Sequence, residues 1–111
     1  MSDGYNGKLL IYASNFASRG DRIRTVSMAT EQMARLLDLN IEIVKFRERF
    51  TQIYVYYKNG DDEPIPIYND KGEKSDIQKI LSALRNMMFV LSFHPRHLAL
   101  SRMRNELMRF S

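Results

Sequence analysis

Cations and aromatic side chains gather between positions 47 and 58 of this sequence. The group consists of Arg47, Arg49, Tyr54, Tyr56 and Lys58. Residues two apart on a strand share one face of a sheet, so Tyr54, Tyr56 and Lys58 are expected side by side. Aromatic rings stack on unpaired bases and cations hold phosphates, although neighbouring tyrosines also simply pack across strands. One hypothesis is therefore a sheet face that binds nucleic acid.

A second group of residues is more apolar than one small core requires. Its members are Phe89, Val90, Phe93, Leu98 and Met108. The chain also has seven methionines, a residue that adapts to irregular surfaces and is favoured where proteins meet. Either the last helix folds back over these side chains, or they form a surface patch that binds a second copy of the chain or another protein. Our first hypothesis is a non-catalytic protein-binding or regulatory module, a homodimer built through its C-terminal helices.

Residues typical of catalytic or metal centres are sparse. The chain has no cysteine, and His94 and His97 have no third partner for zinc, which needs three or four ligands. Four acids lack the spacing of a calcium-binding loop, so we expect them at a solvated turn. They are Asp61, Asp62, Glu63 and Asp70. Since a phosphate-binding glycine loop and a nucleophile elbow are also missing, we expect no catalytic site, no metal and no cofactor. An enzyme of an unfamiliar class is a third hypothesis, ranked below the other two.

The composition is that of one globular domain over residues 1–111, with 44% hydrophobic and 27% charged residues. A net charge of +4 is compatible with a nucleic-acid partner without requiring one. The longest apolar run, Met87 to Leu91, is far shorter than the about 20 residues of a membrane span. Because the chain starts without a basic signal-peptide region and has no disulfides, we expect a cytoplasmic location and no membrane contact.

Apolar stripes at helical spacing predict three helices that would position these groups. The first begins with Asp21 as its cap and ends near Asn40, a residue that tolerates the left-handed conformation. The second begins at a capping box of Ser75 and Gln78. Pro95 ends that helix and opens the last one, whose apolar face is expected to hold Ala99, Leu100, Met103, Leu107 and Phe110.

The remaining segments predict strands. Residues 9–13 favour a buried strand, although they also fit one face of a helix that would end at Gly20. Residues 41–68 alternate with period two. A single strand there would carry Lys45, Arg47 and Arg49 into the core, so we place a turn or bulge near residues 47–49 that divides the segment into two strands.

A second turn is predicted at residues 59–62, where Asn-Gly-Asp-Asp closes the next hairpin. Pro64 and Pro66 lie two residues apart, and their missing N–H groups are tolerated on the unpaired side of an edge strand. Residues 63–68 are therefore expected at an edge of the sheet.

Together these elements predict an α+β domain in the order β-α-β-β-β-α-α. We expect a small antiparallel sheet with the helices packed mainly on one face.

Overall fold

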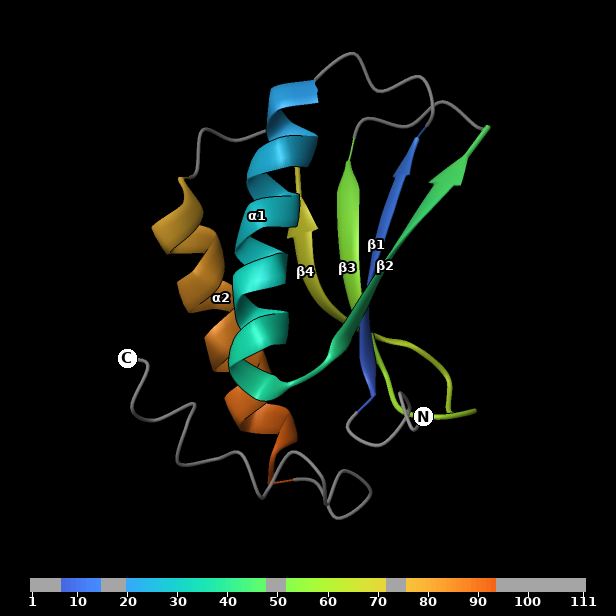
Figure 1. The fold of residues 1–111 in the computed structure, drawn as a ribbon, viewed down its shortest axis with the longest axis vertical. Helices are drawn as coiled ribbons and strands as arrows, with labels where there is room; N and C mark the ends of the chain where they lie inside the picture. Colours follow the sequence, from blue (N-terminus) through green and yellow to red (C-terminus); the bar gives the residue numbers. More distant parts are fainter. Residues whose placement is uncertain (1–6, 15–19, 48–51, 72–75, 94–111) are drawn as a thin grey trace.

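The chain forms a sheet with helices packed on one of its faces (Figure 1). The computed structural model describes residues 7–14, 20–47, 52–71 and 76–93. Their elements are β1 (Lys8–Ser14), α1 (Gly20–Leu37), β2 (Asn40–Phe46), β3 (Ile53–Lys58), β4 (Ile65–Asp70) and α2 (Ile77–Leu91). The predicted α+β class and the order β-α-β-β-β-α are confirmed. The last predicted helix, from Pro95 onward, lies outside the described residues.

The sheet has four strands in the order β2-β1-β3-β4. β3 pairs antiparallel with β1 and with β4, as expected, but β1 and β2 are parallel. The expectation of a wholly antiparallel sheet was therefore wrong at this pair. The cause is α1, since a helix between two strands carries the chain back so that the second strand runs in the same direction as the first.

The chain reverses between β2 and β3 as expected, but these strands do not form a hairpin. β1 lies between them and pairs with both, through all seven of its residues on the β2 side. A hairpin around Arg47 was the simpler expectation because sequential strands are usually neighbours. Alternation of side chains along a strand does not reveal which strand lies beside it.

β1 is the central strand, and this explains why residues 9–13 are apolar without interruption. Leu9, Ile11 and Ala13 are fully buried against the helices, while Leu10, on the other face, is only 5% exposed. A strand covered on both faces has no reason to alternate. The ambiguity between strand and helix is resolved in favour of the strand.

The hydrophobic core lies between this sheet and the two helices. α1 and α2 contribute the stripes that the sequence indicates, and β1, β3 and β4 contribute every second residue. The helical members of the core include Val26, Ala29, Met33, Leu37, Ile80, Leu81, Leu84 and Met88. Their strand counterparts include Leu9, Ile11, Ala13, Ile53, Val55, Tyr57 and Ile67.

The ends of α1 differ from the expected ones. The helix begins at Gly20, so Asp21 lies in its first turn and is not the residue before it. At the other end Asp38, and not Asn40, takes the left-handed conformation with a φ of 56°. Aspartate shares the tolerance of asparagine for this region, and Asn40 is the first residue of β2.

α2 is capped by Asp76, one residue later than the expected Ser75. The Asp76 carboxylate accepts a hydrogen bond of 2.9 Å from the Lys79 backbone N–H, the bond that stabilises a helix start. Ser75 lies outside the described residues. A side-chain cap of the expected kind is therefore present, but with Asp76 and Lys79 in place of Ser75 and Gln78. The path of the backbone, as well as the residue type, decides which side chain caps a helix.

The predicted turn at residues 59–62 and the predicted edge strand are both confirmed. The Asp62 N–H donates to the Asn59 carbonyl at 3.0 Å, and Gly60 has a φ of 60°. β4 is an edge of the sheet, and its Pro66 pairs with Tyr56 next to a bulge. Proline and a bulge are both features that discourage further strand pairing.

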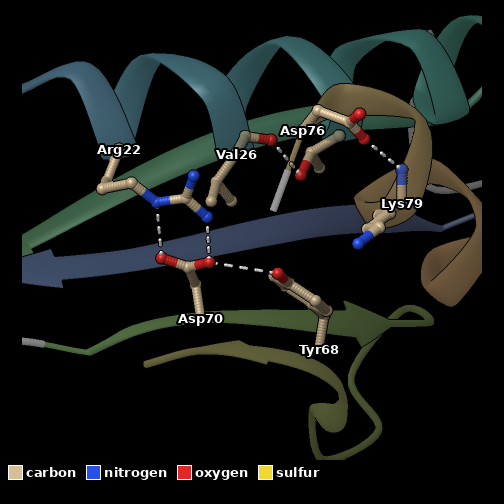
Figure 2. Close-up of polar contacts among 7 residues, drawn as sticks. Arg22, Val26, Tyr68, Asp70, Asp76 and Lys79 are labelled. Atoms are coloured by element: carbon tan, nitrogen blue, oxygen red, sulfur yellow. Dashed lines mark hydrogen bonds and ion pairs between the residues drawn. The ribbon is translucent and has the colours of Figure 1, made fainter. Parts of the chain in front are cut away.

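A polar cluster joins the start of α1 to the end of β4 (Figure 2). Asp70 is only 1% exposed, and both its oxygens accept hydrogen bonds from the Arg22 guanidinium, one of them at 3.2 Å from Nε. The Tyr68 hydroxyl donates to the same carboxylate at 3.1 Å. Asp70 was expected at a solvated turn, and this was wrong. It stands at the far end of β4 from that turn, where α1 covers it.

Gly7 allows the start of β1 to lie against the buried Tyr57. Its φ is +93°, and a Cβ there would stand 2.7 Å from the Lys58 carbonyl oxygen and 3.0 Å from the Tyr57 ring. Only glycine fits this conformation and this approach without strain. Burial, with a smaller contribution from the nearby Asp62 carboxylate, raises the pKa of the Tyr57 hydroxyl to about 12.

Replacing Asp70 by alanine should lower the free energy of unfolding by about 3 kcal/mol, because it removes the buried carboxylate that pairs with the largely buried guanidinium of Arg22. Denaturant titration followed by circular dichroism measures this. Tyr68→Phe removes one hydrogen bond to the same carboxylate and should cost only about 1 kcal/mol. Equal losses in the two variants would contradict the central role of the ion pair.

The raised pKa of Tyr57 predicts a stability loss in alkali. Its contribution is fully present below about pH 10, where the tyrosine is neutral in both states, and disappears as the pH rises toward 12. The loss should amount to about 2 to 3 kcal/mol. The Tyr57→Phe variant has no hydroxyl to ionise, so its free energy of unfolding should not show this loss of about 2 to 3 kcal/mol between pH 10 and 12. An equal decline in the two proteins over this pH range would refute the raised pKa of Tyr57.

Candidate binding surfaces

The sheet face opposite the helices is the first candidate surface. The strand register places Tyr54, Tyr56 and Lys58 on one face, away from the buried Ile53, Val55 and Tyr57. The expected side-by-side arrangement of these three residues is therefore present. Their partners on β1 and β2 share the same face, and the sequence alone did not single them out. These are Lys8, Leu10, Tyr12, Ser14, Glu42, Val44 and Phe46.

Three rings form a row across the strands, which we call the aromatic row. Tyr56 on β3 lies 4.9 Å from Tyr12 on β1, with 38° between the ring planes. Tyr12 lies 5.3 Å from Phe46 on β2, with a 60° tilt. All three side chains are half-buried. The row ends at β2, the outermost strand on this side of the sheet.

Two lysines face each other at one end of this surface. Lys8 and Lys58 are direct cross-strand partners, an arrangement that is unfavourable for like charges unless a counter-charge is near. Lys8 has one, since its Nζ lies 3.0 Å from a Glu42 carboxylate oxygen. In the described part of the chain no ion pair involves Lys58. The group of three charges keeps a net +1, which suits an anion.

Arg47 is exposed and directly follows Phe46, just beyond the end of β2. Successive side chains along a strand point to opposite faces, so Arg47 does not share the face of Phe46 by this alternation. The cations that the structure places on this surface are therefore Lys8 and Lys58. Arg49, the fifth residue of the predicted group, lies outside the described residues.

The C-terminal end of α2 is the second candidate surface. Val90 is 61% exposed and Phe93 57% exposed, whereas Phe89 packs against the core and meets the Phe93 ring edge-on at 5.0 Å. Leu98 and Met108, the other members of this predicted patch, lie outside the described residues. The structure thus brings together the first three members of the apolar group, one half-buried and two exposed.

Within residues 7–14, 20–47, 52–71 and 76–93, no group of three or more acidic, histidine or cysteine side chains is arranged to hold a metal ion. The helices in these ranges are also too short or too polar to cross a membrane. His94 and His97 lie outside these ranges.

Tyr12, Phe46 and Lys8 are the residues that sequence reasoning missed. Each lies on a different strand from the predicted Tyr54, Tyr56 and Lys58. The one sign of this face in the sequence of β1 was Tyr12, an aromatic residue next to the aliphatic Leu9, Leu10 and Ile11. The pairing of β1 with both β2 and β3 was needed to bring these residues together.

Comparison with known proteins adds no further guide to these surfaces: no protein-family model, no curated protein and no solved structure matches this chain.

Proposed function

We propose that this protein binds single-stranded nucleic acid on the sheet face opposite its helices. The observation that carries the proposal is the aromatic row, Tyr56, Tyr12 and Phe46, with Lys8 and Lys58 on the same face at one end of the strands. Aromatic side chains on a sheet and a positive flanking surface are the two features that such proteins combine. The net charge of +4 also favours binding of the negatively charged phosphate backbone.

The chemistry of the face favours unpaired bases over a duplex. Bases within a double helix already stack on one another, and a flat sheet face does not enter a groove as a helix does. Unpaired bases expose their own faces and can stack on rings of any sequence context. The lysine pair at one end then supplies a position for a backbone phosphate, beside the Tyr56 ring two residues from Lys58.

A Tyr56→Leu substitution should weaken binding of a labelled mixed-sequence oligonucleotide of about 12 nucleotides by roughly tenfold, because a stacked base contributes about 1–3 kcal/mol. Lys58→Ala should also weaken it and should lower the slope of log affinity against log salt by about 0.7. Fluorescence anisotropy across a salt series measures both effects.

Lys79→Ala is the matched control for charge, since Lys79 is an exposed lysine on α2, in the helical layer. It should leave the affinity and the salt slope close to those of the unmodified protein. Absent binding at low salt, salt-insensitive binding, or an equal effect of Lys58→Ala and Lys79→Ala would each exclude the proposal.

A second candidate function is association with protein through the C-terminal end of α2, either self-association or binding of another chain. The exposure of Val90 and Phe93 supports it, because large apolar side chains that stand together on a surface are typical of contact sites. Phe93→Ser should then convert an assembly into a monomer in light scattering, and an unchanged mass would count against this surface.

A further inference from the structure

We infer that Glu42 occupies, beside the Lys8 ammonium, the position that a backbone phosphate of the ligand takes on binding. The carboxylate is an internal competitor: it must leave Lys8 before the phosphate binds there, and this exchange weakens binding. The inference rests on the proposed nucleic-acid function, because the phosphate belongs to that ligand.

The ion pair between Lys8 and Glu42 is of a kind that exchanges easily. The Lys8 Nζ lies 3.0 Å from a Glu42 carboxylate oxygen, and the two side chains are 40% and 53% exposed. Both lie on the sheet face opposite the helices, where Glu42 is the partner of Leu10. An exposed pair contributes little free energy, because water screens the charges and two side chains must be held in one geometry. Another anion can therefore replace the carboxylate at small cost.

Lys58 favours a phosphate over the carboxylate at this position. It is the direct cross-strand partner of Lys8, so the Cβ atoms of the two lysines are expected about 5 Å apart. Within the described ranges Lys58 takes part in no ion pair. A lysine ammonium is a point charge on a long flexible stem, and the separate oxygens of one phosphate can accept hydrogen bonds from both ammonium groups.

The backbone that carries these side chains is held by close contacts. A Cβ at Gly7 would stand 2.7 Å from the Lys58 carbonyl oxygen, so the start of β1 approaches the end of β3 as closely as glycine allows. On the other side the Asn40 N–H donates to the Gly7 carbonyl at 3.4 Å. Three strands are thus joined where the charges lie. Exchange at Lys8 requires side chains to move but no backbone to become ordered, which keeps the cost of binding low.

The aromatic row begins next to this group of charges. Tyr56 precedes Lys58 by two residues on the same face, a distance of about 7 Å along a strand. A base that stacks on Tyr56 therefore brings its own phosphate toward the two lysines. Phosphate binding at Lys8 and stacking on the row belong to one site.

The turn beyond Lys58 makes the exchange at Lys8 more important. Asp61 and Glu63 are exposed there, and Asp62 is half-buried. In the part of the chain that the structure describes, none of these acids pairs with a lysine. A phosphate beside Lys58 is repelled by them, so one lysine alone gives it little attraction. The release of Lys8 from Glu42 makes a second cation available.

The test compares two glutamate variants of the full chain by the same anisotropy measurement with the strand of about 12 nucleotides. Glu42→Gln keeps the size of an exposed side chain and frees Lys8. It should tighten binding about three- to fivefold and steepen the slope of log affinity against log salt by about 0.7, since one more lysine contacts a phosphate.

Glu31→Gln is the matched control. Glu31 is also 53% exposed and also lies in an ion pair, 3.8 Å from Arg35 on α1. The two substitutions change the net charge equally, so their difference measures the local effect of Glu42. Glu31→Gln should change the affinity less than twofold and leave the salt slope as it is.

A Lys8→Ala background completes the test. Lys8→Ala alone should weaken binding, and the further change Glu42→Gln should then leave the salt slope unaltered, because no lysine remains to be freed. Equal effects of the two glutamate variants, weaker binding by Glu42→Gln, or a slope change that persists without Lys8 would each overturn the inference and leave the proposed function standing. Absent binding by the unmodified protein at low salt would refute the proposed function, and the inference with it.

Discussion

The two helices of the described residues pack on the same face of the sheet, and the composition of the opposite face follows from that constraint. Among the described residues no helix lies on that opposite face, so there the central strand β1 is covered by side chains of the sheet itself. Tyr12, Tyr56 and Phe46 lie across it in contact with one another, and Leu10 on the same face is almost inaccessible to water. The large rings therefore have a structural role as well as the proposed role in binding.

These two roles are compatible because an aromatic ring has two faces and a polar edge. A tyrosine can shield the backbone beneath it with one side and remain accessible on the other, and its hydroxyl tolerates water. An aliphatic layer of the same area would leave a surface prone to aggregation. The half-buried state of the row fits a surface that is stable when unoccupied and available to a flat ligand.

Local patterns in the sequence were sufficient for the elements and insufficient for their arrangement. Period-two alternation indicated β3, Asn59-Gly60 indicated the turn after it, and Pro64 with Pro66 indicated an edge strand, because each depends only on nearby residues.

The insertion of β1 between β2 and β3 depends on α1 returning the chain, which no local pattern records. The proposed binding face was predicted only in part for the same reason: Tyr54, Tyr56 and Lys58 belong to one strand, whereas Tyr12, Phe46 and Lys8 become their neighbours only through pairing. Asp70 shows the same limit, since its burial depends on Arg22, 48 residues away.

The strand order also explains why the protected and unprotected edges fall where they do. β4 is tied to the helical layer by the Arg22–Asp70 ion pair and by the apolar contacts of α2, and its proline and bulge give its outer side little to offer a neighbour. Among the described residues β2 pairs only with β1, and its Ile43 is 48% exposed. The described edge with the more regular backbone is therefore also the edge at which the aromatic row ends.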